Sequence, residues 1–373
     1  MAGWAKPKRT GTDRRQVLRG ALAGSLAAVS FPAPAIAKDR IRWRMLTTWP
    51  KNFPGVGTAA QRIADRIEAL SDGRMEINLY AAGEFVPAFE VFDAVREGKA
   101  ECGHDAPYYW IAKDRGVAFF CSLPGGLTPW EQAAWVQYGG GQELWDELYA
   151  GFGLRAFLAG NAGMQMIGWF RNEIKSVADF KGLKIRMAGM QAEVLNRLGA
   201  TTVNLPGGEI MPALQSGVID AAEWGGPWMD LAFGFYKVTR YCYGPGVHEP
   251  GAAQSLVVNL EAYGKLPRDL QEIVRVAAEV EAIRLLGEFT VMNARAYQSL
   301  IKEHDVKMGS LPQDVLKRWF ELSADVVAEI ADDNALDRRI YESWSTFRRQ
   351  AVDLGPLTEL GFMQARFAAT NGA

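Results

Sequence analysis

Arg186 is the residue whose type and setting most clearly indicate binding chemistry. It lies within a short apolar run at residues 183–187, just before Gly189, where a strand would end and turn. A guanidinium at a strand end can bind a carboxylate through two parallel charge-assisted hydrogen bonds. The alternative is a solvated arginine at the edge of a sheet. The apolar neighbours favour the ligand-binding interpretation.

A second cluster lies at residues 220–227, which read Asp-Ala-Ala-Glu-Trp-Gly-Gly-Pro. Glu223 stands where a strand gives way to a Gly-Gly-Pro turn, so its carboxylate could face a cleft. Trp224 offers a backbone carbonyl for a cation and an indole wall for a ligand. The alternative is a salt-bridged acid beside a core tryptophan, and these residues alone favour neither interpretation.

Three further residues carry polar or aromatic groups that could face the same cleft. Gln165 is an uncharged polar residue within the apolar run 164–170, although a strand with one solvated face would also place it there. Tyr108 begins a Tyr-Tyr-Trp run that resembles a pocket wall or a piece of core. Glu249 is an oxygen donor in a loop, where a solvated acid is the common alternative.

Enzyme motifs are poorly represented in this chain. No phosphate-binding loop, G-x-S-x-G nucleophile turn or H-E-x-x-H zinc motif occurs in the sequence. The three histidines, at positions 104, 248 and 304, are scattered, and Cys102, Cys121 and Cys242 form no Cys-x-x-Cys pair. Few groups are therefore available as general bases near neutral pH, and the sequence predicts a protein that is not an enzyme.

The first 37 residues have the features of an export signal. A basic stretch containing Arg14 and Arg15 precedes a short apolar run at residues 20–31 and an Ala-Ile-Ala sequence. The arginine pair favours the twin-arginine route, and an ordinary basic leader is the alternative. The remaining 336 residues hold 35 basic and 42 acidic residues, a net charge near −7 that disfavours nucleic acid as a partner.

The elements that must position these residues alternate between strands and helices. Residues 41–106 read as strand, helix, strand, helix, strand, which predicts a parallel sheet with ligands beyond the strand ends, near residues 47–49 and 108–110. Residues 164–224 repeat this alternation, and long amphipathic helices follow from about residue 266.

The predicted fold class is therefore α/β, with two lobes around a central cleft, since 336 residues exceed a single core. We assign residues 38–160 with a return segment at about 253–300 to lobe I. Residues 161–252, with a helical segment at about 301–334, form lobe II, and residues 335–373 form a C-terminal helical region.

Three stretches make the chain resemble a known family. Residues 83–98, 180–186 and 208–224 are similar to runs found in the DctP-type extracytoplasmic solute receptors of TRAP (tripartite ATP-independent periplasmic) transporters. The Glu-Trp-Gly-Gly-Pro run at 223–227 and the Pro-Gly-Val-His-Glu-Pro-Gly run at 245–251 look closest to the branch that binds α-keto acids or lactate with a metal cation. The resemblance covers essentially all residues after the leader.

The resemblance implies a periplasm-located receptor with a periplasmic binding protein-like fold, and it implies a role for each candidate residue. Arg186 would pair with the substrate carboxylate, with Gln165, Trp224 and Tyr108 as further substrate contacts. Glu223, Glu249, Gln165 and the Trp224 carbonyl would hold the cation, for which hard oxygen donors favour Na⁺ or Ca²⁺.

The implied partners are a small organic carboxylate such as pyruvate or lactate, the membrane subunits of a TRAP permease, and a second copy bound through helices in residues 335–370. Three alternatives remain open at this stage. The chain could be a periplasmic enzyme whose metal activates water, a receptor for a bulkier carboxylate, or a receptor that serves another type of importer.

Overall fold

The computed structural model describes residues 40–371. The predicted export signal at residues 1–37 lies outside this range. In the described part of the chain, no helix has the length and apolar character needed to cross a bilayer.

The first sheet has five strands in the order β2-β1-β3-β10-β4. The strands β1, β2 and β3 are mutually parallel as predicted, whereas β10 runs antiparallel to both β3 and β4. The prediction of a parallel sheet therefore holds for the first three strands only. The strands span β1 (Ile41–Thr47), β2 (Met75–Tyr80), β3 (Cys102–Asp105), β4 (Leu154–Asn161) and β10 (Ala253–Asn259).

Helices α2 (Val56–Leu70) and α3 (Val91–Arg96) connect the parallel strands of this sheet. In α2, Ile63, Ala64 and Ile67 recur on one face and are buried against the sheet, which is the spacing of an amphipathic helix. Their burial drives the helix onto the sheet, and it leaves Arg62 and Arg66 along a neighbouring, half-buried face.

The second sheet has six shorter strands in the order β11-β9-β5-β8-β6-β7. β6 runs parallel to β7 and β8, while β5 is antiparallel to β8 and β9. The strands span β5 (Gly168–Phe170), β6 (Lys184–Arg186), β7 (Thr201–Val203), β8 (Ala221–Ala222), β9 (Tyr241–Gly244) and β11 (Lys307–Ser310), and the helices are α6 (Gln191–Arg197), α7 (Gly207–Ser216) and α8 (Pro227–Phe233).

Two predicted strands of this sheet are shorter than expected. Only residues 168–170 of the run 164–170 form a strand, so Gln165 lies in the loop that leads into β5. In this loop the Met166 amide donates to the Gly225 carbonyl and not to a strand neighbour. Likewise β8 comprises two residues, and Glu223 and Trp224 follow it directly. Both differences move candidate side chains from strands into loops at the strand ends.

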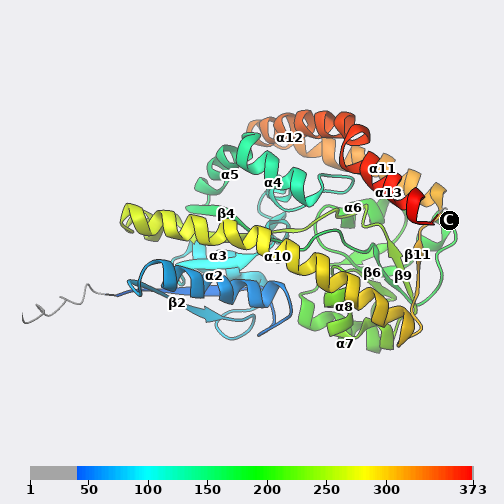
Figure 1. Cartoon of the computed structure of the whole chain (residues 1–373), viewed down its shortest axis with the longest axis horizontal. Helices are drawn as coiled ribbons and strands as arrows, with labels where there is room; N and C mark the ends of the chain where they lie inside the picture. The colour runs from blue at the N-terminus through cyan, green and yellow to red at the C-terminus, as the bar shows by residue number, and fades with distance from the viewer. Residues whose placement is uncertain (1–39, 372–373) are drawn as a thin grey trace, which may run out of the picture. The chain divides into compact units, whose positions relative to one another are not determined.

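Helix α10 (Arg268–Lys302) links the two sheets. This helix, drawn in yellow in Figure 1, packs on β4 and α2 at one end and on α8 at the other. The remaining helices are α4 (Pro129–Tyr138), α5 (Gly141–Ala150), α9 (Leu260–Gly264), α11 (Gln313–Ala328), α12 (Ala335–Leu354) and α13 (Glu359–Asn371). The predicted α/β class with two sheet-based lobes and long helices is confirmed.

Candidate functional site

Arg186 is the last residue of β6, and its side chain is almost completely buried, with 1% exposed. Its Nη1 donates to the Glu223 carboxylate at 2.8 Å and to the Glu223 backbone carbonyl at 2.6 Å, and its Nε donates to the Leu205 carbonyl. The guanidinium carbon lies 5.0 Å from the centre of the Trp224 ring. Burial alone would lower the pKa of Arg186, but the adjacent Glu223 and its neighbours raise it above its ordinary value.

The other terminal nitrogen of Arg186, Nη2, is buried and has no hydrogen-bond partner within residues 40–371. An arginine carries five N–H donors, and buried donors are normally paired. This guanidinium can therefore accommodate a further acceptor, such as a carboxylate oxygen.

Glu223, His248 and Glu249 meet beside Arg186. All three are fully buried, and each offers one ligand atom within 4.8 Å of the others. The Glu223 Oε1 atom lies 3.6 Å from His248 Nε2 and has no hydrogen-bond partner among the described residues. Two acidic side chains thus face a single guanidinium, which leaves a surplus of acidic groups in a buried space.

Two glutamine amides hold the second carboxylate in place. Gln165 Nε2 donates to Glu249 Oε1 at 3.2 Å, and Gln191 Nε2 donates to Glu249 Oε2 at 2.9 Å. Burial and then the charge of Glu223 raise the pKa of Glu249 well above its usual range, while the charge of Arg186 and then hydrogen bonds from Tyr108 and Gln191 oppose that rise. The amide oxygens of both glutamines have no partner in the described chain, so they are additional candidate cation ligands.

Local structure explains why these groups converge. β6 and β8 are parallel neighbours, so Arg186 and Glu223 emerge at the same edge, where the Glu223 amide bonds the Arg186 carbonyl at 3.1 Å. Gly189 adopts φ +68°, a conformation that glycine reaches at little cost, and it turns the chain from β6 into α6. That turn brings Gln191, the first residue of α6, back toward Glu249.

The first sheet supplies aromatic side chains that line a cavity beside these charged groups. Trp49 follows β1, and Tyr108 and Tyr109 follow β3, so all three extend from the carboxyl ends of parallel strands. The Trp49 ring lies edge-on to the Trp224 ring, with 6.3 Å between centroids. A small cavity between the sheets is lined by Trp49, Val56, Tyr108, Tyr109, Ala162, Gln165, Trp224, Met229, Ala252 and Gln254.

Comparison with known proteins identifies the family. Residues 45–334 match the family described as bacterial extracellular solute-binding protein, family 7. The chain belongs to this family.

Relatives of this solute-binding protein have named ligands. A monocarboxylate 2-oxoacid-binding periplasmic protein of Nostoc sp. is 40% identical over 322 residues, which cover 86% of this chain and 88% of the relative.

Two solved structures of TRAP solute-binding proteins are similar along most of their length. One from Pseudoalteromonas atlantica, with bound sodium and pyruvate, has a TM-score of 0.84 at 38% identity and covers 87% of this chain and 99% of its own. One from Bordetella bronchiseptica, a dimer with calcium and picolinate in one active site, has a TM-score of 0.87 at 35% identity and covers 89% and 98%.

Every predicted site residue of the solute-binding protein lies in this one region. Arg186, Glu223 and Glu249 form the charged centre, and Gln165, Trp224 and Tyr108 border it, as the contacts above describe. Gln191 and Gln254 were not anticipated, and His248 was treated as isolated. The only available signal for these three was a polar residue near a strand or helix end, which is too common to be selective.

Proposed function

We propose that this protein is the solute receptor of a TRAP transporter, and that it binds a small 2-oxo or 2-hydroxy acid, such as pyruvate or lactate, together with Na⁺ or Ca²⁺. The observation that carries the proposal is the buried Arg186, which has an unpartnered Nη2 and two buried carboxylates beside it. A solute carboxylate would complete the guanidinium, and a cation would neutralise the carboxylates. The ligands of the relatives have this chemistry.

Each residue has a distinct role in this proposal. Arg186 pairs with the solute carboxylate, and Tyr108 and the Trp224 indole contact the rest of the solute. Glu223, Glu249, the Trp224 carbonyl and the Gln165 amide oxygen would hold the cation. Oxygen donors of this kind suit Na⁺ and Ca²⁺.

Charge explains why solute and cation should bind together. When Glu223 and Glu249 are both ionised, as cation ligands must be, one guanidinium and two carboxylates leave −1, and a solute carboxylate increases this to −2. An uncompensated buried charge costs several kcal/mol, so an added anion needs an added cation. A divalent ion cancels the excess, and a monovalent ion halves it.

The transport role follows from the proposed binding. The receptor is exported to the periplasm by the twin-arginine route, and its lobes, residues 38–160 with 253–300 and residues 161–252 with 301–334, close over the solute. It then delivers the solute to the membrane permease without a chemical step. Helices α12 and α13 form a dimer interface, which the exposed Phe362 and Met363 on α13 favour.

The decisive experiment is calorimetric titration with pyruvate after exhaustive removal of Na⁺ and Ca²⁺, followed by restoration of each ion. Binding should be weak in K⁺ buffer with chelator and tight with Na⁺ or Ca²⁺. Binding that is equally tight in all three buffers would contradict the cation role.

Isotope-labelled pyruvate tests for chemistry in the same samples. Stoichiometric retention of unchanged pyruvate supports a receptor, whereas turnover would establish an enzyme. Mass spectrometry of the protein as purified should find a small 2-oxo or 2-hydroxy acid, and a bulkier carboxylate in its place would revise the solute class.

A further inference from the structure

His104 is buried behind the aromatic wall of the candidate site. It is the third residue of β3, none of its surface is exposed, and its Nδ1 lies 2.8 Å from Trp49 Nε1. An indole nitrogen can only donate, so Nδ1 must accept and the ring proton must be on Nε2. That proton points toward the Ala159 carbonyl, whose oxygen lies 3.3 Å from Nε2. Both ring nitrogens are therefore committed, one to each neighbour.

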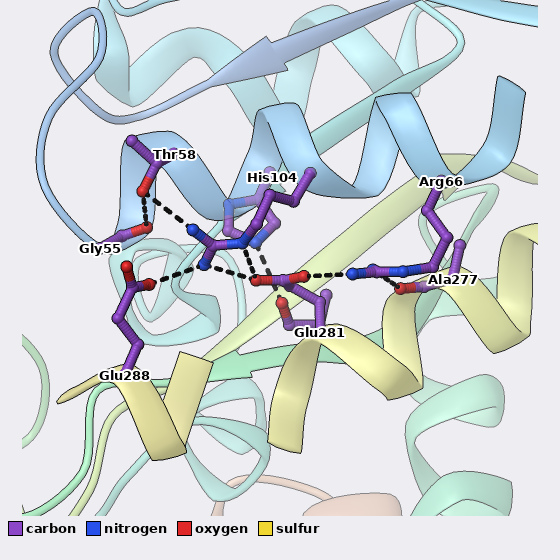
Figure 2. Close-up of polar contacts among 9 residues, drawn as sticks. Gly55, Thr58, Arg66, His104, Ala277, Glu281 and Glu288 are labelled. Atoms are coloured by element: carbon purple, nitrogen blue, oxygen red, sulfur yellow. Dashed lines mark hydrogen bonds and ion pairs between the residues drawn. The ribbon is translucent and has the colours of Figure 1, made fainter. Parts of the chain in front are cut away.

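The imidazole is held in its neutral form. Burial is the largest cause that lowers the pKa of His104 to about 4, and the charge of Arg62 adds to it, while the Ala159 hydrogen bond opposes it. Arg62 on α2 is itself held by Glu281 and Glu288 of α10, and Figure 2 shows His104 next to this network. A neutral His104 can accept from Trp49, whereas a protonated one cannot.

The Trp49 ring has no other hydrogen-bond partner for its N–H among residues 40–371, although its backbone is independently held. The Trp49 carbonyl accepts from the Ala82 amide at 3.0 Å and from the Thr47 hydroxyl at 3.3 Å. His104 therefore acts on the orientation of the indole and not on the path of the chain.

The orientation of this indole matters because it contacts the cavity and the opposite sheet. Its ring packs against Tyr109 at 6.1 Å and against Trp224 at 6.3 Å, and Trp224 in turn stacks with Arg186. Trp49 comes from the first sheet and Trp224 from the second. A shift of the indole would change both the room available in the cavity and the contact across it.

We propose that His104 is a positioning residue that holds Trp49 as the wall limiting the size of the solute's side chain. This inference rests on the proposed function, because it assigns the selectivity of the same site. A fixed indole favours short 2-oxo acids such as pyruvate and excludes longer, branched ones. A freed indole relaxes this preference.

Two amide variants separate the two hydrogen bonds of His104, because each places a polar atom near only one of the ring nitrogens. His104→Asn keeps an acceptor where Nδ1 lies and loses the group at Nε2, whereas His104→Gln keeps a donor where Nε2 lies and loses the acceptor for Trp49. Each variant would be titrated with pyruvate and with 2-oxo-4-methylpentanoate, in the presence of Na⁺ or Ca²⁺, and its melting temperature would be measured.

We expect the preference for pyruvate, given by the ratio of the two dissociation constants, to fall at least tenfold in His104→Gln and to stay within threefold of the parent in His104→Asn. In a Trp49→Phe background, which has no N–H to anchor, His104→Gln should change the ratio by less than twofold. Such non-additivity is the signature of one residue acting through another.

Three results would overturn the assignment. The first is an unchanged ratio of dissociation constants in His104→Gln. The second is a change of this ratio that is equal in the two variants and correlates only with their melting temperatures. The third is an effect of His104→Gln on the ratio that is just as large in the Trp49→Phe background. If the parent protein binds neither acid with either cation, the proposed function fails and this inference fails with it. If the parent binds and the variants do not differ, only the role of His104 is refuted.

Discussion

Two clusters of buried charge in this protein differ in how completely they are paired. Glu281 of α10 is fully buried and accepts from Arg62 at 2.7 Å and from Arg66 at 2.9 Å, and Arg62 also pairs with Glu288 (Figure 2). We call these four residues the α2–α10 network. The site cluster consists of Arg186, Glu223 and Glu249, in which a guanidinium nitrogen and a carboxylate oxygen have no partner in the described chain.

The difference indicates what each cluster is for. Two arginines balance two glutamates in the α2–α10 network, and no buried side-chain atom of the four is unpaired within residues 40–371. The site cluster has one positive and two negative groups, so it is complete only with added ligands. Buried ion pairs are costly unless fully compensated, which makes incomplete pairing a stronger signal of binding than burial of charge alone.

The largest expected effect is on folding, through the α2–α10 network. Glu281→Ala leaves two arginines without their shared partner and should lower the free energy of unfolding by about 3–5 kcal/mol. Pyruvate affinity of the folded fraction should stay within about threefold, a difference of less than 1 kcal/mol. Denaturant titration and calorimetry measure these two quantities.

Glu288→Ala is the control for that variant. Glu288 is one-third exposed and pairs with Arg62 alone, so its loss should cost about 1 kcal/mol or less. A loss of affinity in Glu281→Ala as large as that caused by changing Arg186 would show that the two clusters are not separate.

Arg186→Ala should give the converse result, a loss of binding. Removal of a desolvated carboxylate partner typically costs about 2–5 kcal/mol, so pyruvate affinity should fall by at least an order of magnitude. Arg186→Lys should recover little of it, because an ammonium cannot form the two-pronged pairing. Arg155→Ala, at a pair with Asp146 in which each side chain is one-third exposed, is the matched control and should bind normally.

The same Glu→Gln change should act oppositely in the two clusters. Glu281→Gln removes a needed charge and should destabilise the protein, whereas Glu249→Gln removes a surplus charge and should leave the ligand-free protein at least as stable as the parent. In the presence of Ca²⁺, Glu249→Gln should weaken pyruvate binding about tenfold, or ~1.4 kcal/mol. Destabilisation of the ligand-free Glu249→Gln protein would mean that Glu249 is structural.

The pH dependence of stability should reveal two buried groups that have no ionic partner within residues 40–371, Asp105 and His104. Burial raises the pKa of Asp105 to about 6, although Ser255 and Trp110 hydrogen bonds oppose this, and lowers the pKa of His104 to about 4. Between pH 4 and 6 the folded Asp105 keeps a proton that the unfolded chain loses, so its contribution to stability falls as pH rises. The neutral folded His104 contributes the opposite slope, because the unfolded histidine is protonated there.

Asp105→Asn removes the contribution of Asp105, so the free energy of unfolding of the variant should follow the rising contribution of His104 between pH 4 and 6. The variant's free energy of unfolding relative to the parent should rise by about 1.4 kcal/mol per pH unit between pH 4 and 6 and then level off. Asp305→Asn, at an exposed acid, should give a flat difference. A flat difference in Asp105→Asn would mean that the Asp105 carboxyl is ionised throughout this range.

Local pattern was enough to find the strongest site residues. Arg186 and Glu223 interrupt apolar runs just before turns, and this alone indicated that they emerge at strand ends. The same reasoning correctly predicted β1, α2 and β2, where periodicity is long and regular. It was wrong for Gln165, which was predicted within a strand but lies in a loop that contacts Gly225. The lobe boundaries stay a prediction.

The amino-acid sequence by itself determined the α/β class, the excess of acidic residues in residues 38–373, and which side chains stand at the ends of apolar runs, because all of these depend on composition or on neighbours along the chain. Only the tertiary structure decided that β10 would insert antiparallel between β3 and β4, and that Gln191 and His248 would reach the buried space beside Arg186. Gln191 and Glu249 are 58 positions apart, and Ser255 of β10 is 150 positions from Asp105 of β3, so these contacts depend on strand order and on where the chain crosses between sheets. Periodicity, a property of neighbouring residues, carries no information about either.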